Sequence, residues 1–315
     1  MTLPNTKAST PQRPSNMSST PLAKHDIPLL SSVSEYRVLS IRQLAVISHR
    51  SCQVVRRRIR SLEDRGLIIK KPFGYGRNQG RPEEIVYLSL EGMKRLSDKS
   101  TNSIPADIKS HTIDHELLLN WFRIHWLHME KAIHLLSFTY LSPKKCSSET
   151  NQLFRQHFPS GLGNGNANAI IPDGILAIKH NQHGKALLFF LEVDMDSEAM
   201  TGRKGNTNNI HHKILCYRDL YRNEHYKRLE AAFDSKFNGF RLLFLAITDA
   251  RVAALCRFAK TTQISDFIWL TDQTRMFDHG LSANIWVRGC RYEDPRESIL
   301  GSGLASESPI IESIR

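Results

Sequence analysis

IIPDGILAIKHNQHGKALLFFLEVDMD, residues 170–196, contains two apolar runs separated by the turn sequence NQHG. Aliphatic and β-branched runs bounded by proline and glycine predict two strands joined by a hairpin turn. Side chains alternate between the two faces of a strand, so Glu192, Asp194 and Asp196 project to one side of the second strand. Because buried charge is costly unless it is paired, hydrogen-bonded or bound to metal, we expect a polar cleft there.

The composition favours a globular protein with a polyanionic partner. The chain has 315 residues, is 40% hydrophobic and carries a formal net charge of +12, which allows two domains with their own cores. Residues 40–100 contain fourteen Lys and Arg against six Asp and Glu, a surplus of eight. A basic stretch of this kind is typical of nucleic-acid-binding proteins.

The five cysteines are scattered and form no CxxC pair, which indicates reduced thiols and argues against a zinc knuckle or a disulfide scaffold. No apolar run approaches the length of a membrane span, and residues 1–28 lack a hydrophobic signal region. We therefore expect a cytoplasmic protein that does not associate with membranes.

Residues 28–98 have the pattern of a small helical domain. Residues 1–27 are rich in Ser, Thr, Pro and Asn, so we expect a disordered tail. A first helix follows, and Ser40 and Ser51 then stand where N-caps of a second and a third helix belong. Gly66 is a good stop for the third helix.

The stretches LIIKK and EEIVYLSL flank the glycine-rich segment PFGYGRNQGRP and predict a two-stranded hairpin after the three helices. This order is that of a winged helix-turn-helix, in which the third helix enters the major groove of duplex DNA. The candidate DNA-binding residues are Gln53, Arg56, Arg57 and Arg60 on that helix and Lys70, Lys71, Arg77 and Arg81 on the hairpin. The alternative is a solvated basic helix in an RNA-binding or partner-binding module.

The rest of the chain predicts an α/β domain. Residues 99–111 are polar and form our linker, 112–290 the domain, and 291–315 a flexible tail. His111 and His115 are four residues apart but lack the order of a zinc-protease motif, so we interpret them as a polar helix start. Glu116 is an alternative candidate for reaching the acidic cleft.

The order helix, strand, strand, strand, helix, strand in 112–247 resembles the core of the PD-(D/E)xK, or restriction-endonuclease-like, superfamily. The resemblance implies that Asp173 and Glu192 hold Mg²⁺ or Mn²⁺ and that Asp173, Glu192, Asp194 and Lys213 are catalytic. One departure is clear: Asp194 stands where the superfamily has a lysine, and Lys213 could replace that lysine from the next helix. Two alternatives remain open, an inactive site or a cluster that Lys213 or Arg218 only neutralises.

The whole chain resembles the replication-relaxation family of plasmid and mobile-element proteins. The residues that carry the resemblance are SIRQLAVIS, VVRRRIRSLEDRGLI, IVYLSLEGMKRL, HELLLNW, IIPDGILAI, FFLEVDMDSE and KILCYRDLY. The resemblance implies a DNA-binding protein of plasmid replication, relaxation or mobilisation, with double-stranded DNA and other plasmid replication or mobilisation proteins as partners. The alternatives are a Mg²⁺-dependent nuclease or nickase and a winged-helix transcriptional regulator.

Overall fold

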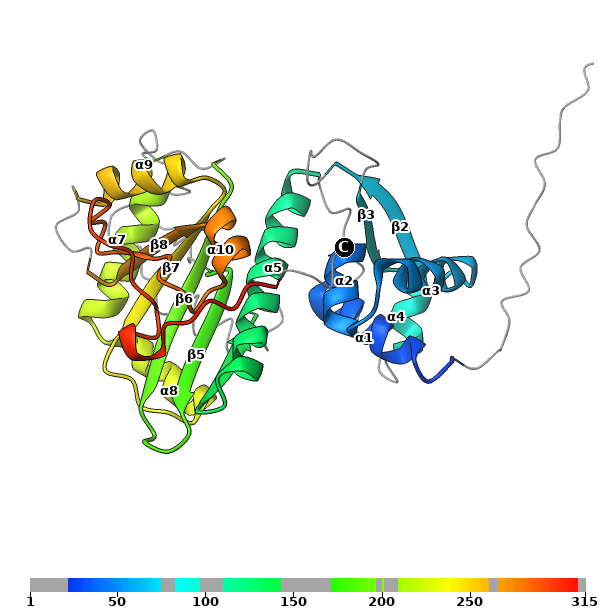
Figure 1. The fold of residues 1–315 in the computed structure, drawn as a ribbon, viewed down its shortest axis with the longest axis horizontal. Helices are drawn as coiled ribbons and strands as arrows, with labels where there is room; N and C mark the ends of the chain where they lie inside the picture. The colour runs from blue at the N-terminus through cyan, green and yellow to red at the C-terminus, as the bar shows by residue number, and fades with distance from the viewer. Residues whose placement is uncertain are drawn as a thin grey trace, which may run out of the picture.

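The computed structural model describes residues 22–74, 83–96, 110–142, 171–196, 200, 209–260 and 266–310, with only the backbone at 110–112. The protein is a mixed α/β structure with one three-stranded and one six-stranded sheet (Figure 1). Most of the predicted tail 1–27 and linker 99–111, as well as Arg77 and Arg81, lie outside the described residues. Among those described, no helix combines the length and the hydropathy that crossing a membrane requires.

The N-terminal unit, residues 26–96, contains the predicted three helices and hairpin. Its elements are α1 Asp26–Tyr36, β1 Leu39–Ser40, α2 Ile41–Ser48, α3 Cys52–Asp64, β2 Ile68–Phe73, β3 Glu83–Leu88 and α4 Leu90–Leu96. The strands pair antiparallel in the order β1-β3-β2. The two-residue strand β1 was not predicted, because so short a stretch has no periodicity of its own.

Both predicted N-caps are confirmed. Ser40 forms a capping box with Gln43, in which the Ser40 Oγ accepts from the Gln43 N–H at 3.2 Å and the Gln43 Oε1 accepts from the Ser40 N–H at 2.9 Å. The Ser51 Oγ accepts from the Val54 N–H at 3.4 Å. These caps fix where α2 and α3 begin.

The second unit is built on the six-stranded sheet, in the order β4-β5-β6-β7-β8-β9. Strands β6, β7 and β8 are parallel, and the remaining neighbours are antiparallel. The elements are α5 Ser110–Ala132, β4 Leu136–Leu141, β5 Gly174–His180, β6 Ala186–Asp194, α7 Ile210–Arg222, η2 His225–Leu229, α8 Glu230–Phe233, β7 Phe240–Ala246, α9 Asp249–Ala259, β8 Ile268–Asp272, α10 Gln273–His279, β9 Val287–Arg288 and η4 Ser302–Leu304. The predicted order up to β7 is present, and the short helices η2 and α8 before β7 were missed.

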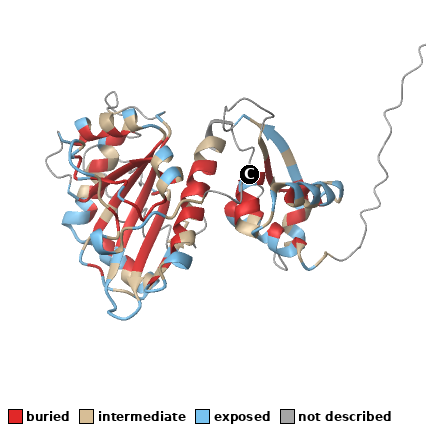
Figure 2. Ribbon diagram, in the orientation of Figure 1, coloured by how far each residue is buried: buried red, intermediate tan, exposed pale blue. Residues whose placement is uncertain are grey.

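The central strand β6 is buried on both faces, as its alternating pattern predicts. Phe189 and Leu191 belong to the apolar cluster that contains α5, whereas Leu188 and Phe190 belong to the cluster that contains α7 and α9. Helices thus cover both sides of the sheet (Figure 1), and the strands are almost entirely buried (Figure 2). Trp126 of α5, fully buried, packs edge-on against Phe189 at 5.6 Å between ring centroids.

Helix α5 packs against both units. The Gln43 side chain donates to the Leu117 carbonyl at 2.7 Å, and the Asn120 side chain donates to the Val38 carbonyl at 2.7 Å. The Arg123 guanidinium lies 4.1 Å from the Tyr36 ring of α1 and 4.8 Å from the Tyr140 ring of β4. The helix therefore lies between α1 and α2 on one side and the large sheet on the other (Figure 1).

The prediction of a flexible tail from residue 291 is wrong for residues 291–310. Glu297 forms a two-way backbone bridge with Trp286, at 3.0 and 2.9 Å, and Ile299 is fully buried. The Ser282 hydroxyl donates to the Ser306 carbonyl at 2.8 Å. Backbone and serine hydrogen bonds hold this polar segment, and a reading based on apolar periodicity does not detect such bonds.

Candidate functional site

Asp173 and Glu192 lie at one edge of the large sheet, because β5 begins where its antiparallel partner β6 ends. We call this place the acid edge, and define it by Asp173, Glu192 and Asp194. The Asp173 N–H donates to the Leu191 carbonyl, and the Asp173 Oδ2 accepts from the Val193 N–H, both at 2.9 Å. The hairpin predicted from the sequence thus brings the two acids together.

The Glu192 carboxylate is only 2% exposed and is paired on both oxygens. The Lys213 Nζ lies 2.9 Å from Oε2, and the Tyr217 hydroxyl donates to Oε1 at 2.5 Å. Both donors project from the same face of α7, since they are four residues apart. Burial raises the pKa of Glu192 to about 7, opposed by the Lys213 charge and reinforced by that of Asp173.

His115 is a member of the site that sequence reasoning missed. Its Nε2 lies 3.0 Å from the Asp173 Oδ2, so the histidine belongs to the acid edge and not to a polar helix start. The available signal was helical spacing: His115 is three and four residues before Leu118 and Leu119, which are buried. Glu116 has a different partner, the Arg37 guanidinium at 3.6 Å.

Arg251 neutralises the remaining acids. Its Nε lies 3.1 Å from the Asp194 Oδ2, and its Nη1 lies 2.7 Å from the Asp196 Oδ1. The sequence pointed to Lys213 or Arg218 for this role, but Arg218 pairs with Asp219 at 3.6 Å. Arg251 stands at the start of α9, just after β7, whose end is in register with Asp194. Only the parallel pairing of β6 and β7 places it there.

The predicted polar cleft is therefore wrong in one respect. Glu192 and Asp194 are 2% and 3% exposed and are enclosed by ion pairs, and they do not line an open cleft. Both oxygens of Glu192 already accept hydrogen bonds, and within the described part of the chain no three His, Cys, Asp or Glu side chains are placed to share a metal ion. The described arrangement does not fit a resident Mg²⁺ or Mn²⁺ at Asp173 and Glu192.

A second candidate site is the outward face of α3. Its candidates Gln53, Arg56, Arg57 and Arg60 are all exposed. Residues 36–62 contain seven arginines and no Asp or Glu. Among the described residues, no ion pair involves Arg57 or Arg60, so these two guanidinium groups remain open to a ligand.

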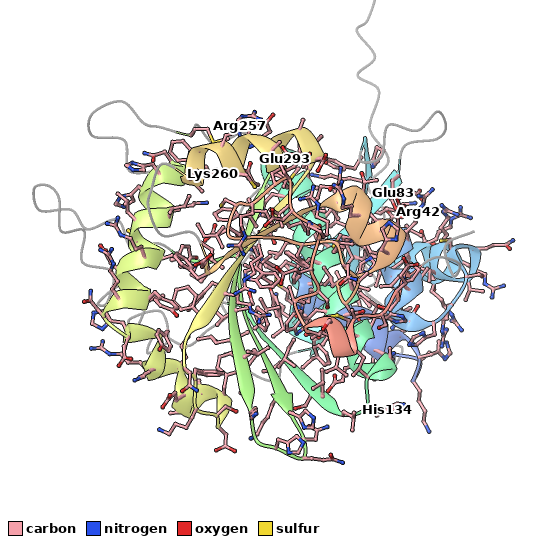
Figure 3. All side chains as sticks on the ribbon, turned by 60° about the vertical axis from the view of Figure 1, so that its left-hand side comes forward. Arg42, Glu83, His134, Arg257, Lys260 and Glu293 are labelled. Carbon is pink, nitrogen blue, oxygen red and sulfur yellow. The ribbon has the colours of Figure 1, made fainter. Side chains whose placement is uncertain are left out.

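The remaining candidates of this face differ from one another. Glu84 of β3 pairs with Arg56 at 3.4 Å and with Lys70 at 3.3 Å, so both cations are already partly neutralised. The Lys71 ammonium lies 5.5 Å from the centre of the Tyr87 ring. Next to this group, Arg42 approaches Glu83 at 4.0 Å (Figure 3). The sequence prediction treated Arg56, Lys70 and Lys71 as available for DNA, because their partners come from the returning strand and cannot be recognised locally.

A family model described as replication-relaxation matches residues 30–235, which span α1 to α8. The chain belongs to the replication-relaxation family. The resemblance expected from the sequence blocks is thus confirmed. Membership of the replication-relaxation family indicates a role in the replication or relaxation of plasmid or mobile-element DNA.

Two other comparisons add little to this replication-relaxation assignment. No curated protein matches the chain. One solved structure that matches is a MarR family transcriptional regulator from Silicibacter pomeroyi DSS, at 24% identity and a TM-score of 0.20. The match covers 28% of this chain and 64% of the regulator, less than two thirds of its length. A TM-score this low supports no conclusion about fold or function.

Proposed function

We propose that this replication-relaxation protein binds duplex DNA through a winged helix formed by α1 to α3 and the β2–β3 hairpin. In this arrangement α3 lies in the major groove and the hairpin touches the phosphate backbone. The observation that carries the proposal is the exposed outward face of α3, on which Arg57 and Arg60 have no ion pair with the described residues.

The chemistry of this face suits DNA. An arginine guanidinium presents donors in a planar fork that matches the O6 and N7 acceptors of guanine, and a glutamine side chain matches adenine. The surplus of positive charge in residues 40–100 releases counterions from the duplex and gives affinity for any sequence. Arg57, Arg60 and Gln53 would then supply the sequence preference.

The second unit, on this proposal, positions the winged helix and offers a surface for other replication or mobilisation proteins. Its acid edge is neutralised internally by Lys213 and Arg251, and the His115 Nε2 lies 3.0 Å from the Asp173 carboxylate. Such a buried, paired network is what a structural element needs, because each charge finds its partner inside the fold.

The test measures binding of fluorescently labelled duplexes, cut from the replicon that encodes the protein, by anisotropy. Replacing Arg57 and Arg60 by alanine should weaken specific binding, with each lost bidentate base contact worth about 1–3 kcal/mol. The matched control is Arg222→Ala with Arg228→Ala, which removes the same charge from exposed positions of the other unit. Equal losses in the two double variants would refute the assignment of α3 as the recognition helix.

A second candidate function is a metal-dependent nuclease or nickase. The observation in its favour is that Asp173, Glu192 and Lys213 converge at one sheet edge, as the nuclease-like resemblance requires. The filled oxygens of Glu192 oppose it. Supercoiled plasmid incubated with Mg²⁺ or Mn²⁺ decides the matter: nicking by the wild type that Asp173→Ala and Glu192→Ala both abolish would establish the enzyme, and retardation without nicking would exclude it.

A further inference from the structure

We infer that His49, Arg50, His128 and Lys131 form a second phosphate-binding surface, which holds the DNA backbone beside the groove occupied by α3. This inference rests on the proposed function and deepens it, because it brings the first helix of the second unit into the DNA contact. We call these four residues the junction surface.

The junction surface is held together by a direct contact between the two units. The Lys131 Nζ, in the last turn of α5, lies 2.9 Å from the His49 Nε2 at the end of α2. His49 adopts φ 53° and ψ 44°, the left-handed conformation that favours glycine at a helix end. This backbone conformation is unfavourable for a histidine, and the His49 side chain contacts Lys131.

The charge of this surface is not balanced by an acid in the described structure. An ammonium is a donor only, so the His49 Nε2 is the acceptor in this contact and offers no negative charge to Lys131. The positive charge of Lys131 therefore remains available. No ion pair to Arg50 occurs among the described residues, and no acid stands between Tyr36 and Leu62. Glu130, the acid next to Lys131, is exposed.

His128 is within electrostatic reach of the same group. Burial, and then the positive charge of Lys131, lower the pKa of His128. Neutral histidine still donates one N–H, so His128 can contact a phosphate oxygen without a proton being added. His49, Lys131 and His128 thus lie near one another, and Arg50 directly follows His49 in the chain.

The position of the junction surface relative to α3 identifies the ligand. His49 and Arg50 directly precede Ser51, the N-cap of α3, so they lie at the N-terminal end of the helix that carries Gln53 and Arg56. When a helix enters the major groove, the phosphate backbones run along both sides of its N-terminal end. A duplex docked on α3 therefore brings one backbone to Arg50 and Lys131. Contacts of this kind carry no sequence information and set position and affinity.

The test compares the salt dependence of duplex binding by wild-type full-length protein, Arg50→Gln with Lys131→Gln, and the control Lys185→Gln with Arg222→Gln, which neutralises two exposed cations elsewhere. Each phosphate contact contributes about 0.9 to the slope of log K against log salt. We expect the slope of the junction variant to be shallower by about 1.8, with the sequence preference unchanged. Arg50→Gln combined with Lys131→Arg, which keeps the positive charge at position 131, should recover part of the lost slope.

The outcomes separate the two proposals. A junction variant whose slope matches the control, in a protein whose binding still depends on Arg57 and Arg60, would overturn the junction surface and leave the winged-helix proposal standing. Loss of sequence preference in the junction variant would also overturn it, because backbone contacts do not select bases. A wild-type protein that binds no duplex would overturn both.

Discussion

Replacing Lys213 by methionine removes the ammonium that lies 2.9 Å from the Glu192 Oε2 and leaves Tyr217 as the remaining side-chain donor to that carboxylate. Removing one partner of a buried ion pair costs about 3–5 kcal/mol, because the other charge stays buried and uncompensated. The Lys213 side chain is itself 16% exposed, so some water reaches the pair. We therefore expect the lower end of that range, a loss of about 3 kcal/mol in the free energy of unfolding at pH 8.

The loss should depend on pH in a defined direction. Burial raises the pKa of Glu192 from 4.5 to about 7, so the folded protein holds this proton more tightly than the unfolded chain. The stability that the protonated Glu192 carboxyl contributes to the folded protein is fully present below pH 4.5 and is lost as the pH rises through 7. Lys213 lowers the pKa of Glu192. In the Lys213→Met variant that pKa is higher, so the pH range over which stability is lost extends above pH 7. The Lys213→Met variant should be close to wild type at pH 5 and clearly weaker at pH 8.

The assay is urea unfolding followed by circular dichroism at pH 5 and pH 8. Four proteins complete a double-mutant cycle: wild type, Lys213→Met, Glu192→Gln and the double variant. Neutralising Glu192 in the Lys213→Met background should recover most of the lost stability at pH 8. The control is Lys185→Met, at an exposed position of the hairpin. A Lys213→Met loss equal to that of the control at pH 8, or an equal loss at both pH values, would refute the uncompensated-charge argument.

Three further perturbations follow from single contacts. Glu84→Gln should release Arg56, while Lys70 keeps its second partner Glu63 at 3.4 Å, and should raise affinity for duplexes of any sequence with a steeper salt slope by anisotropy; unchanged binding would show that Arg56 does not approach DNA. His125 is buried with neither ring nitrogen hydrogen-bonded among the described residues, and burial lowers its pKa to about 3. The stability that the neutral His125 ring contributes is present above pH 6.5 and is lost toward pH 3 by about 1.4 kcal/mol per pH unit. His125→Phe should therefore flatten the acid side of the profile of stability against pH, measured by thermal unfolding. An unaltered profile would contradict this. Asn120→Ala removes the amide that donates to the Tyr36 and Val38 carbonyls, and should lower the free energy of unfolding in urea by about 1–3 kcal/mol. The control Asn223→Ala, at an exposed position, should change it by almost nothing.

The sequence revealed the acids of the sheet edge but not their partners, for a physical reason. Period-two alternation and a hairpin turn are local properties, so Asp173 and Glu192 could be placed together from 27 residues alone. Arg251 reaches Asp194 only because β6 and β7 pair in parallel across a long connection. His115 reaches Asp173 from a helix 58 residues earlier in the chain. Long-range pairing of this kind leaves no local trace in a single sequence.

The outward face of α3 shows the same limit of sequence-based prediction, here for cations. Helical periodicity separated the buried Val55 and Ile59 from the exposed arginines of α3 correctly. It did not show that Glu84, on the returning strand, pairs with Arg56 and leaves Arg57 without such a partner. A hydrophobic pattern determines which side chains face outward, whereas the charges on a neighbouring strand determine which of them remain open to DNA.

Helix α5 sets a geometric condition on any chemistry at the acid edge. His115 and Lys131 are sixteen residues apart on this helix, a distance of about 24 Å at 1.5 Å per residue. A duplex that touched both ends and ran along α5 would span about seven base pairs at 3.4 Å each. An active acid edge would therefore nick DNA at a fixed offset of roughly that size from the phosphates protected by the junction surface. On a duplex to which the protein binds at one defined site, nicks at variable distances from the protected phosphates would not come from this site, because α5 is one continuous helix between the two places.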